Sequence, residues 1–274
     1  MNEIAVAFGT HRSSSRAVEW ASQIAIRSGA HLTVLHVVDR IGRDRSQEPD
    51  QALLAEAQGR LAELLRNAGH FQVAAIVEEG QPTDRLLQLA DQVDADLIVV
   101  GHHGSGDPGP FGPPPATELL LQSSRRPFAV VGDNAPLPES RGRLTMIVGV
   151  DGSRANADSI EKIAVVAEAI DARAVPVLAQ APVAGGHRHE VDPTTSATRL
   201  PGDDALETVH ARAADALLEA ADRHNADLIA IGTRSRHGHD LGDLGDLGDL
   251  ALGETTRHLI DRSARAILVC PHHP

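Results

Sequence analysis

The sequence is poor in several residue types, and each shortage excludes a class of protein. It has no tyrosine, one tryptophan and four phenylalanines in 274 residues, so its core must be built from aliphatic side chains. The single cysteine, Cys270, excludes an intrachain disulfide and a cysteine-held zinc site. Lys162 is the only lysine, and no glycine loop precedes it, which argues against a phosphate-binding or Schiff-base lysine.

Long apolar runs and excess positive charge are also missing. No segment reaches the roughly 18 apolar residues of a membrane span, and residues 1–4 do not begin a secretory signal. The formal net charge of −13 argues against a general nucleic-acid binder, because such a protein needs a basic surface. We therefore expect a cytoplasmic protein that binds neither nucleic acid nor membranes.

The chain contains an internal repeat that covers its two halves. The apolar run at 4–10 is similar to that at 146–153, and Asp94–Gly101 is similar to Asn225–Gly232. Pro127–Val131 matches Ala266–Cys270 in the same order and at similar spacing. Such self-similarity indicates a duplication. The proline-containing stretch 133–140 is typical of a linker, which predicts two domains, at 1–135 and 142–274.

Short β-branched runs alternate with helical patterns in the first half. We expect strands at 3–8, 31–38, 71–77, 96–100 and 127–131, with helices at about 14–28, 48–68, 82–92 and 116–124. This alternation is typical of an α/β fold, in which helices cover both faces of a parallel sheet.

The second half keeps this pattern but has a weaker third strand. Strands are expected at 144–150, 173–179, 227–231 and 266–270, whereas 181–204 has the composition of a loop or of disorder. The third strand lies at about 206–210 or is missing. Pro176 inside the second strand favours an edge position, because proline donates no ladder hydrogen bond.

Three sequence features resemble the universal stress protein family in its tandem two-domain form. They are the first strand with a serine-rich helix start, the run Ala95–Gly104 and the closing Pro127–Val131 strand. The resemblance covers nearly the whole chain. It implies two doubly wound parallel sheets of strand order 3-2-1-4-5, with the third strand weakened or missing in the second domain.

The resemblance also implies a nucleotide pocket, since many family members bind ATP. Those members carry an aspartate after the first strand and Gly-x2-Gly-x9-Gly-Ser/Thr after the fourth. Glycine amides and a helix amino end would bind phosphate, at the switch point beyond the carboxyl ends of the strands.

Matching this pattern to the first half gives an incomplete site. Gly101 and Gly104 match the glycine pair, but Phe8 is placed at the aspartate position and Pro114-Pro115 at the Gly-Ser position. Gly9 and Val37 would also border the pocket. We expect no ATP binding of the family type in this half.

The second half is more complete. Its expected ligand-binding residues are Asp151, Gly152, Ser153, Ala179 (through its backbone), Gly232, Gly253 and Thr255. Ser235 replaces the second glycine of the motif, and Glu254 at the serine position would repel phosphate if it faced the site.

The resemblance implies a stress-response protein that is a non-catalytic regulator rather than an enzyme. Its ligand would be ATP, AMP or a related adenine nucleotide, with or without magnesium. The rival hypothesis is a nucleotide-free scaffold with vestigial pockets that acts through an unknown protein partner. Slow ATP hydrolysis is a third hypothesis. The two domains would pair through their fifth strands as an internal pseudo-dimer, because those edges are otherwise exposed, and a homodimer would be compatible with this.

Two further features favour structural interpretations. The fifteen histidines include clusters at 102–103, 187–189, 237–239 and 272–273, which we interpret as solvated loop residues rather than a metal site. The Leu-Gly-Asp repeat at 241–250 is interpreted as a flexible insertion rather than a calcium-binding array.

Overall fold

The computed structural model describes residues 1–9, 12–38, 59, 73–79, 82–102, 120, 123–138, 142–151, 154–180, 197, 199–202, 204–234 and 254–272. The chain divides into two compact units, Met1–Leu120 with Phe128–Gly142, and Leu121–Pro127 with Arg143–Pro274. The expected helix at 48–68 and most of that at 116–124 lie outside the described residues.

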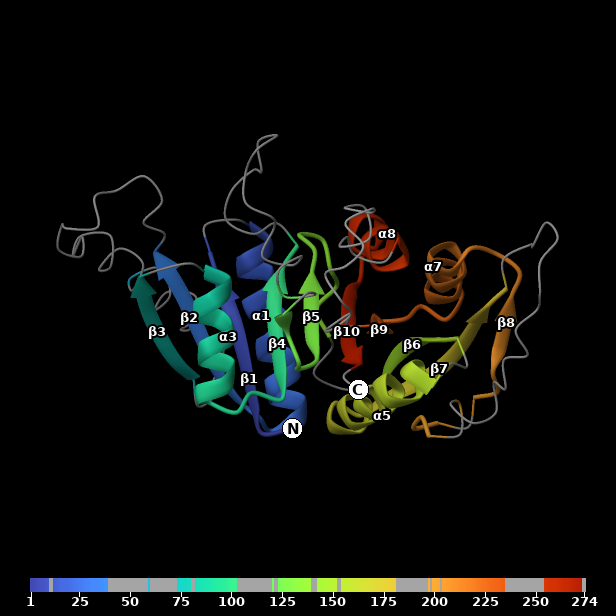
Figure 1. The fold of residues 1–274 in the computed structure, drawn as a ribbon, viewed down its shortest axis with the longest axis horizontal. Helices are drawn as coiled ribbons and strands as arrows, with labels where there is room; N and C mark the ends of the chain where they lie inside the picture. Colours follow the sequence, from blue (N-terminus) through green and yellow to red (C-terminus); the bar gives the residue numbers. More distant parts are fainter. Residues whose placement is uncertain are drawn as a thin grey trace, which may run out of the picture. The chain divides into compact units, whose positions relative to one another are not determined.

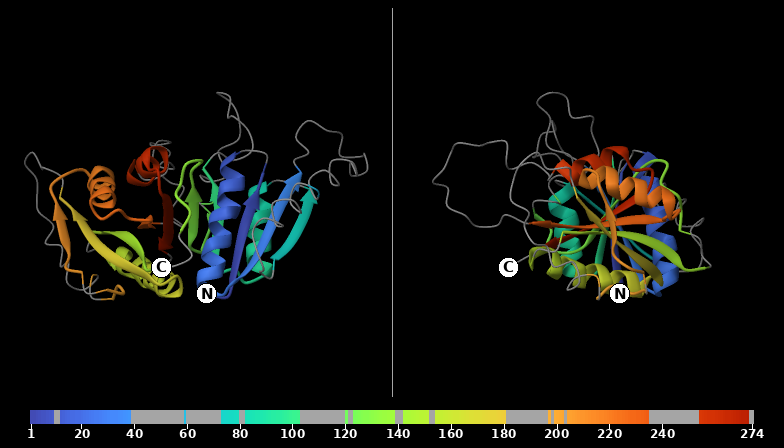
Figure 2. Two further views of the ribbon diagram at one scale, coloured as in Figure 1. Left: turned by 180° about the vertical axis from the view of Figure 1, so that it is seen from behind. Right: turned by 90° about the vertical axis from the view of Figure 1, so that its right-hand side faces the viewer.

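The first unit is a parallel sheet with helices on both faces. Its elements are β1 (Glu3–Phe8), α1 (Arg12–Ser28), β2 (His31–Val38), β3 (Val73–Glu79), α3 (Pro82–Gln92), β4 (Leu97–Gly101) and β5 (Phe128–Val131). The strand order β3-β2-β1-β4-β5 confirms the order expected from the resemblance. Figure 1 shows α3 in front of the sheet, and the left view of Figure 2 shows α1 in front of the opposite face.

The second unit repeats this architecture. Its elements are β6 (Leu144–Val150), α5 (Arg154–Ala169), β7 (Ala172–Ala179), β8 (Glu207–Val209), α7 (Ala213–Arg223), β9 (Leu228–Arg234), α8 (Glu254–Arg262) and β10 (Ala266–His272). The strands are parallel in the order β8-β7-β6-β9-β10, which is again 3-2-1-4-5. The α/β fold class is therefore confirmed in both halves.

The third strand of the second unit is present but short. β8 has three residues and pairs only with Val177–Ala179 of β7. On the side of β7 that faces β8, the Ala174 amide donates to the carbonyl oxygen of Pro201 (3.0 Å). The backbone nitrogen of Pro176 points to the same side of β7, because residues two apart in a strand direct their backbone groups to the same neighbour. Since β8 starts beyond it, Pro176 breaks no ladder hydrogen bond.

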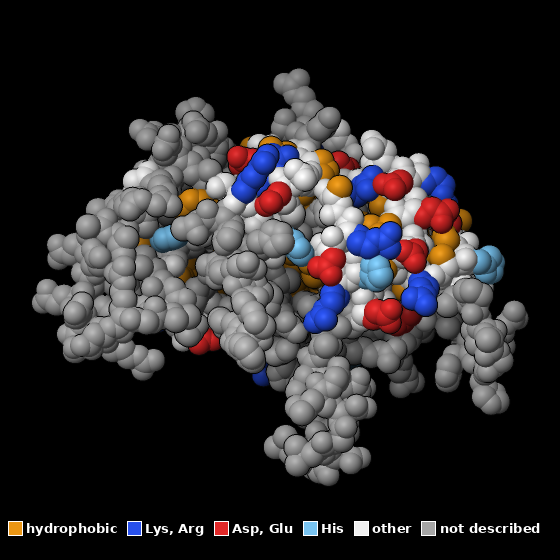
Figure 3. Space-filling view, turned by 90° about the horizontal axis from the view of Figure 1, so that it is seen from above, with side chains coloured by type: hydrophobic (Ala, Val, Ile, Leu, Met, Phe, Trp, Pro, Cys, Tyr) orange, Lys and Arg blue, Asp and Glu red, His pale blue; other side chains and the backbone are white. Residues whose placement is uncertain are grey.

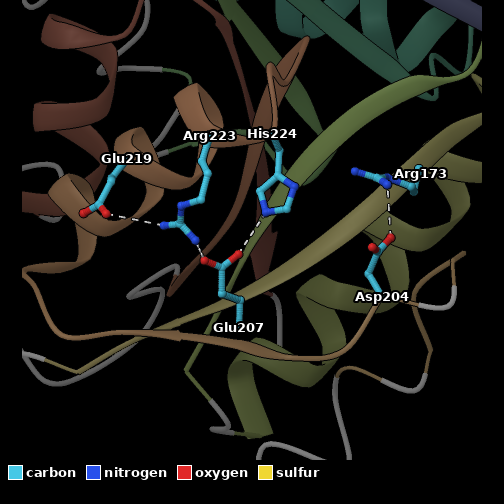
Figure 4. A network of polar contacts seen from close by, with 6 residues as sticks. All are labelled: Arg173, Asp204, Glu207, Glu219, Arg223 and His224. Carbon is cyan, nitrogen blue, oxygen red and sulfur yellow. Dashed lines mark hydrogen bonds and ion pairs between the residues drawn. The ribbon is translucent and has the colours of Figure 1, made fainter.

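Side-chain contacts hold this short strand in place (Figure 4). Glu207 of β8 lies 2.9 Å from His224 Nε2, at the end of α7, and also pairs with Arg223. Arg223 in turn lies 3.5 Å from Glu219, one turn earlier in α7. The ion pairs join β8 to α7, so side chains supplement a ladder of only three residues.

The linker after β5 is bound to α1 at two places. Arg16 Nε donates to the carbonyl of Ala135 (2.7 Å), and an Arg27 amino group donates to that of Gly142 (2.7 Å). The two arginines stand near opposite ends of α1. The segment predicted as a linker is therefore attached to the first unit where the structure describes it.

Buried aliphatic side chains form the cores, as the composition predicts. Trp20 and Phe128 are buried in the first unit, and Cys270 is fully buried in β10. Burial raises the pKa of the Cys270 thiol to about 12, from 9.0, although the charge of Lys162 opposes the shift. In the part of the chain that is described, no helix has both the length and the apolarity to cross a membrane.

Candidate functional site

Strand register defines which residues of the two halves are equivalent. Leu97 and Leu228 occupy the same place in matching Ala-Asp-Leu motifs, and they pair with Ile4 and Met146 respectively. Counting along each strand from these pairs makes Gly9 equivalent to Asp151. The same count makes Gly101 equivalent to Gly232, as predicted.

This register corrects the expected position of Phe8. Phe8 is equivalent to Val150, the last residue of β6, and not to Asp151. Its ring is 9% exposed and lies 5.6 Å from the ring of His36, whose Nδ1 is 2.8 Å from the Phe8 carbonyl oxygen. Phe8 is thus a core residue at the end of its strand, and the first half lacks the carboxylate because Gly9 replaces it.

Asp151 is positioned by the first turn of α5. The Asp151 amide donates to Oδ1 of Asn156 (3.2 Å), and the Asn156 side-chain amide donates weakly to the Gly149 carbonyl (3.4 Å). Asn156 is only 7% exposed, whereas Asp151 is exposed. A buried amide therefore fixes the backbone of Asp151, which is itself an exposed residue at the carboxyl edge of the sheet. Sequence reasoning missed Asn156.

The glycine after the fourth strand has a packing role in each half. A methyl group at Gly232 would lie 2.6 Å from Cβ of Ser159 in α5. At Gly101 it would lie 2.6 Å from the carbonyl carbon of Ser13 in α1. Both distances are too short for a side chain, so these glycines allow the first helix to approach the fourth strand whether or not phosphate binds.

The other described site residues lie at the same edge. Because Leu178 pairs with Val150, Ala179 lies level with Asp151 on the neighbouring strand. Val37 lies level with Gly9 in the same way. Thr255 is in the first turn of α8, which follows β9 and leads into the parallel strand β10. Such a crossover helix begins at the carboxyl edge of the sheet, so Thr255 lies there too.

Glu254 does not stand alone at the start of α8. Its Oε1 lies 3.8 Å from an amino group of Arg212, the residue that precedes α7. Both side chains are largely exposed, at 84% and 78%. The carboxylate that sequence analysis flagged as repelling phosphate therefore has a cationic neighbour.

Several expected site residues lie outside the described residues. They are Gly104, Gly152, Ser153 and Gly253, together with Pro114, Pro115, Ser235, the histidines at 103, 187, 189, 237, 239 and 273, and the 241–250 repeat. Among the histidines that are described, the His102 amide donates to the Val131 carbonyl (2.9 Å), and His272 Nδ1 lies 3.0 Å from Asp158. Within the described ranges, no three His, Cys, Asp or Glu side chains form a metal-binding group.

Comparison with known proteins identifies a matching family and relatives that each cover part of the chain. The family model described as "Universal stress protein family" matches residues 1–131. A Thermus aquaticus protein named "Universal stress protein in QAH/OAS sulfhydrylase 3'region" is 32% identical over 110 residues, which are 39% of this chain and 80% of that protein. Universal stress protein D of Escherichia coli K12 is 26% identical over 109 residues, which are 37% of this chain and 77% of that protein.

A solved structure matches both halves together. The universal stress protein from Archaeoglobus fulgidus DSM 4304 has a TM-score of 0.66 and 15% identity, and the match covers 99% of this chain and 96% of that chain. At this identity the similarity shows the shared fold. Together with the Thermus aquaticus relative and the family match at 1–131, it shows that this chain belongs to the universal stress protein family.

Proposed function

We propose that the second half binds an adenine nucleotide and that the protein acts as a non-catalytic, ligand-dependent stress-response regulator. The observation that carries the proposal is the exposed carboxylate of Asp151, whose backbone is fixed by Asn156. Ala179 lies beside it on β7, and Thr255 is at the same edge. Bound ligand would stabilise the loops at this edge and so change the surface offered to a partner.

The first half is proposed to be the weaker or inactive site. Gly9 supplies no carboxylate where Asp151 does. The two halves therefore differ in the side chain that follows the first strand, although the first and fourth strands pair in the same register.

Thermal denaturation with and without Mg-ATP, ADP or AMP tests the proposal. A ligand that binds only the folded protein raises its stability, by about 2.7 kcal/mol at a concentration of 100 Kd. The shift should vanish in Asp151→Ala. Asp94→Asn is the matched control, because it also removes one carboxylate and Asn225 already occupies the equivalent left-handed position in the other half. An equal shift in Asp151→Ala would exclude this site.

A nucleotide-free scaffold is the second candidate. Gly9 in one half and Glu254 in the other both remove favourable interactions with a nucleotide. Such a scaffold would act through a protein partner. The absence of any thermal shift at millimolar nucleotide, with no ligand retained on purification, would favour it over the binding proposal.

The assembly and location expected from the sequence remain proposals as well. These are pairing of the two halves through 127–131 and 266–270, a homodimer and a cytoplasmic location. Sedimentation analysis of the whole chain, with and without ligand, tests the homodimer.

A further inference from the structure

The Arg212–Glu254 pair lies between the starts of two helices of the second unit. α7 and α8 each connect parallel strands, so both helices begin at the carboxyl edge of the second sheet, where Asp151 also lies. Arg212 precedes α7, and Glu254 is the first residue of α8. Their charged groups are 3.8 Å apart. The pair therefore joins the starts of two helices at the edge that carries the site.

The side chain of Arg212 makes no capping hydrogen bond to the start of α7. Its extended backbone begins α7 without a side-chain capping hydrogen bond, and its carbonyl accepts from the Ala216 amide (2.9 Å). The guanidinium is thus available to Glu254. Other charges on and just after the two helices form pairs with each other, because Arg262 binds Asp215 (2.9 Å) and Arg265, three residues after α8, binds Asp222 (2.8 Å).

The Glu254 carboxylate supplies the negative charge that the start of α8 favours. A helix amino end stabilises a nearby anion, whether it belongs to a ligand or to the protein. Here the protein places its own carboxylate at that point, and Asp151 adds a second one at the same edge. Where the face seen in Figure 3 shows described residues, acidic and basic side chains lie next to one another.

We propose that the Arg212–Glu254 pair sets the phosphate specificity of the site, so that it takes an adenine nucleoside or nucleoside monophosphate in preference to a triphosphate. This inference rests on the proposed function of the second half. Each added phosphate brings negative charge toward Glu254, and Arg212 offsets part of that repulsion. Arg212 is a positioning residue in this scheme, since it acts through Glu254.

Equilibrium binding of adenosine, AMP, ADP and ATP to the whole chain tests the inference, with each nucleotide measured with and without Mg²⁺. The wild type should bind adenosine and AMP more tightly than ATP. Glu254→Gln should improve ATP binding about tenfold and leave adenosine binding unchanged, because only the charged phosphates feel the carboxylate. Arg212→Ala should weaken ATP binding about threefold, an effect that should disappear in the double variant with Glu254→Gln.

Arg199→Ala and Glu161→Gln are the matched controls, since these two residues form another exposed ion pair in the same unit. Neither should change the order of affinities. An unchanged order in Glu254→Gln, with binding intact, would overturn the inference and leave the proposed function standing. Binding of ATP by Glu254→Gln, with none of the four compounds bound by the wild type, would support the role of Glu254 and overturn the proposed function. If no variant bound any of the four compounds, both would be overturned.

Discussion

Asp227 and Thr145 bind each other through two hydrogen bonds at the amino edge of the second sheet. The Asp227 amide donates to the Thr145 carbonyl (2.8 Å), and the Thr145 amide donates to Oδ2 of Asp227 (2.7 Å). Asp96 and Glu3 repeat this arrangement in the first unit, where the two bonds measure 2.9 Å and 3.2 Å. Each Ala-Asp-Leu motif thus fixes the start of the first strand against the fourth.

Replacing Asp227 should therefore reduce stability. Asp227→Ala leaves the Thr145 amide without its carboxylate acceptor, which should cost about 1–3 kcal/mol. The measurement is the free energy of unfolding in urea. Asp261→Ala, at an exposed position in α8, is the control and should change stability by less than about 0.5 kcal/mol. Equal losses in the two variants would contradict this role of the motif.

Gly232→Ala should destabilise the second unit through overpacking. The new methyl group would lie 2.6 Å from Cβ of Ser159, and a forced shift of this kind costs about 1–3 kcal/mol. Gly132→Ala is the control, because nothing lies within 4 Å of a methyl group there. Ser159→Gly in the same chain should recover part of the loss, apart from the cost of glycine in a helix, and the absence of any recovery would argue against this contact.

Substitution by aspartate should reduce stability far more at Phe8 than at Gly9. Phe8→Asp places a charge in the core and removes a buried ring, which should cost more than about 3 kcal/mol. Gly9→Asp should cost much less, because its new Cβ would make one tight contact, 3.2 Å from the hydroxyl oxygen of the small Ser14 side chain. Denaturant unfolding of the two variants decides between them. A stable Phe8→Asp protein would show that the register places Phe8 wrongly.

The Cys270 thiol should be unreactive in the folded protein. Its raised pKa keeps it protonated at pH 8, and burial blocks access, so a thiol reagent should label it only on unfolding. The raised pKa also predicts stability that is complete below about pH 9 and is lost toward pH 12, because the unfolded thiol ionises first. Over this range the free energy of unfolding should fall by up to about 1.4 kcal/mol per pH unit because of this group.

The composition makes this alkaline slope measurable. The chain has no tyrosine and one lysine, so few other side chains titrate between pH 9 and 12. Unfolding of Cys270→Ala should show a flatter dependence on pH in that range. An identical slope in the variant would assign the effect to another group.

Glu207 should contribute more to the local stability of β8 than to the stability of the whole second unit. Glu207→Ala removes the pairs with His224 and Arg223, so the amides of residues 207–209 should exchange faster with solvent. Global stability should fall by about 1 kcal/mol or less, because the pairs are partly exposed. Glu219→Ala, which removes only the distant Arg223 contact, should leave β8 exchange unchanged. Equal exchange in both variants would show that the strand does not depend on Glu207.

Sequence patterns predicted the buried strands well, because each is a short aliphatic run bounded by turn residues. They did not give the equivalence of Gly9 and Asp151. Matching runs by their ends can slip by one residue, whereas the pairing of Ile4 with Leu97 and Met146 with Leu228 cannot. The spacing from the first strand to the Ala-Asp-Leu motif differs between the halves, because Leu97 follows Ile4 by 93 residues and Leu228 follows Met146 by 82, so spacing alone did not reveal the register.

β8 and the site residue Asn156 were harder to foresee for a different reason. Glu207–Val209 is polar and short, so its pattern left open whether a strand lies at about 206–210 or is missing, and its support comes from His224, which is distant in sequence. Asn156 lies within a helix, so only its hydrogen bond to the Asp151 amide reveals its role. Both depend on tertiary contacts that a local pattern does not contain.

The close approach of Gly101 to Ser13, and of Gly232 to Ser159, bears on how the two copies of the repeat diverged. A copy that gave up its ligand would still be selected for folding, and folding alone is enough to retain this glycine. The presence of this glycine in either copy therefore does not report on ligand binding. A survey of sequences that takes this glycine as a sign of nucleotide binding would include proteins that keep it only for helix packing. The residue that follows the first strand, Gly9 or Asp151, distinguishes the two copies.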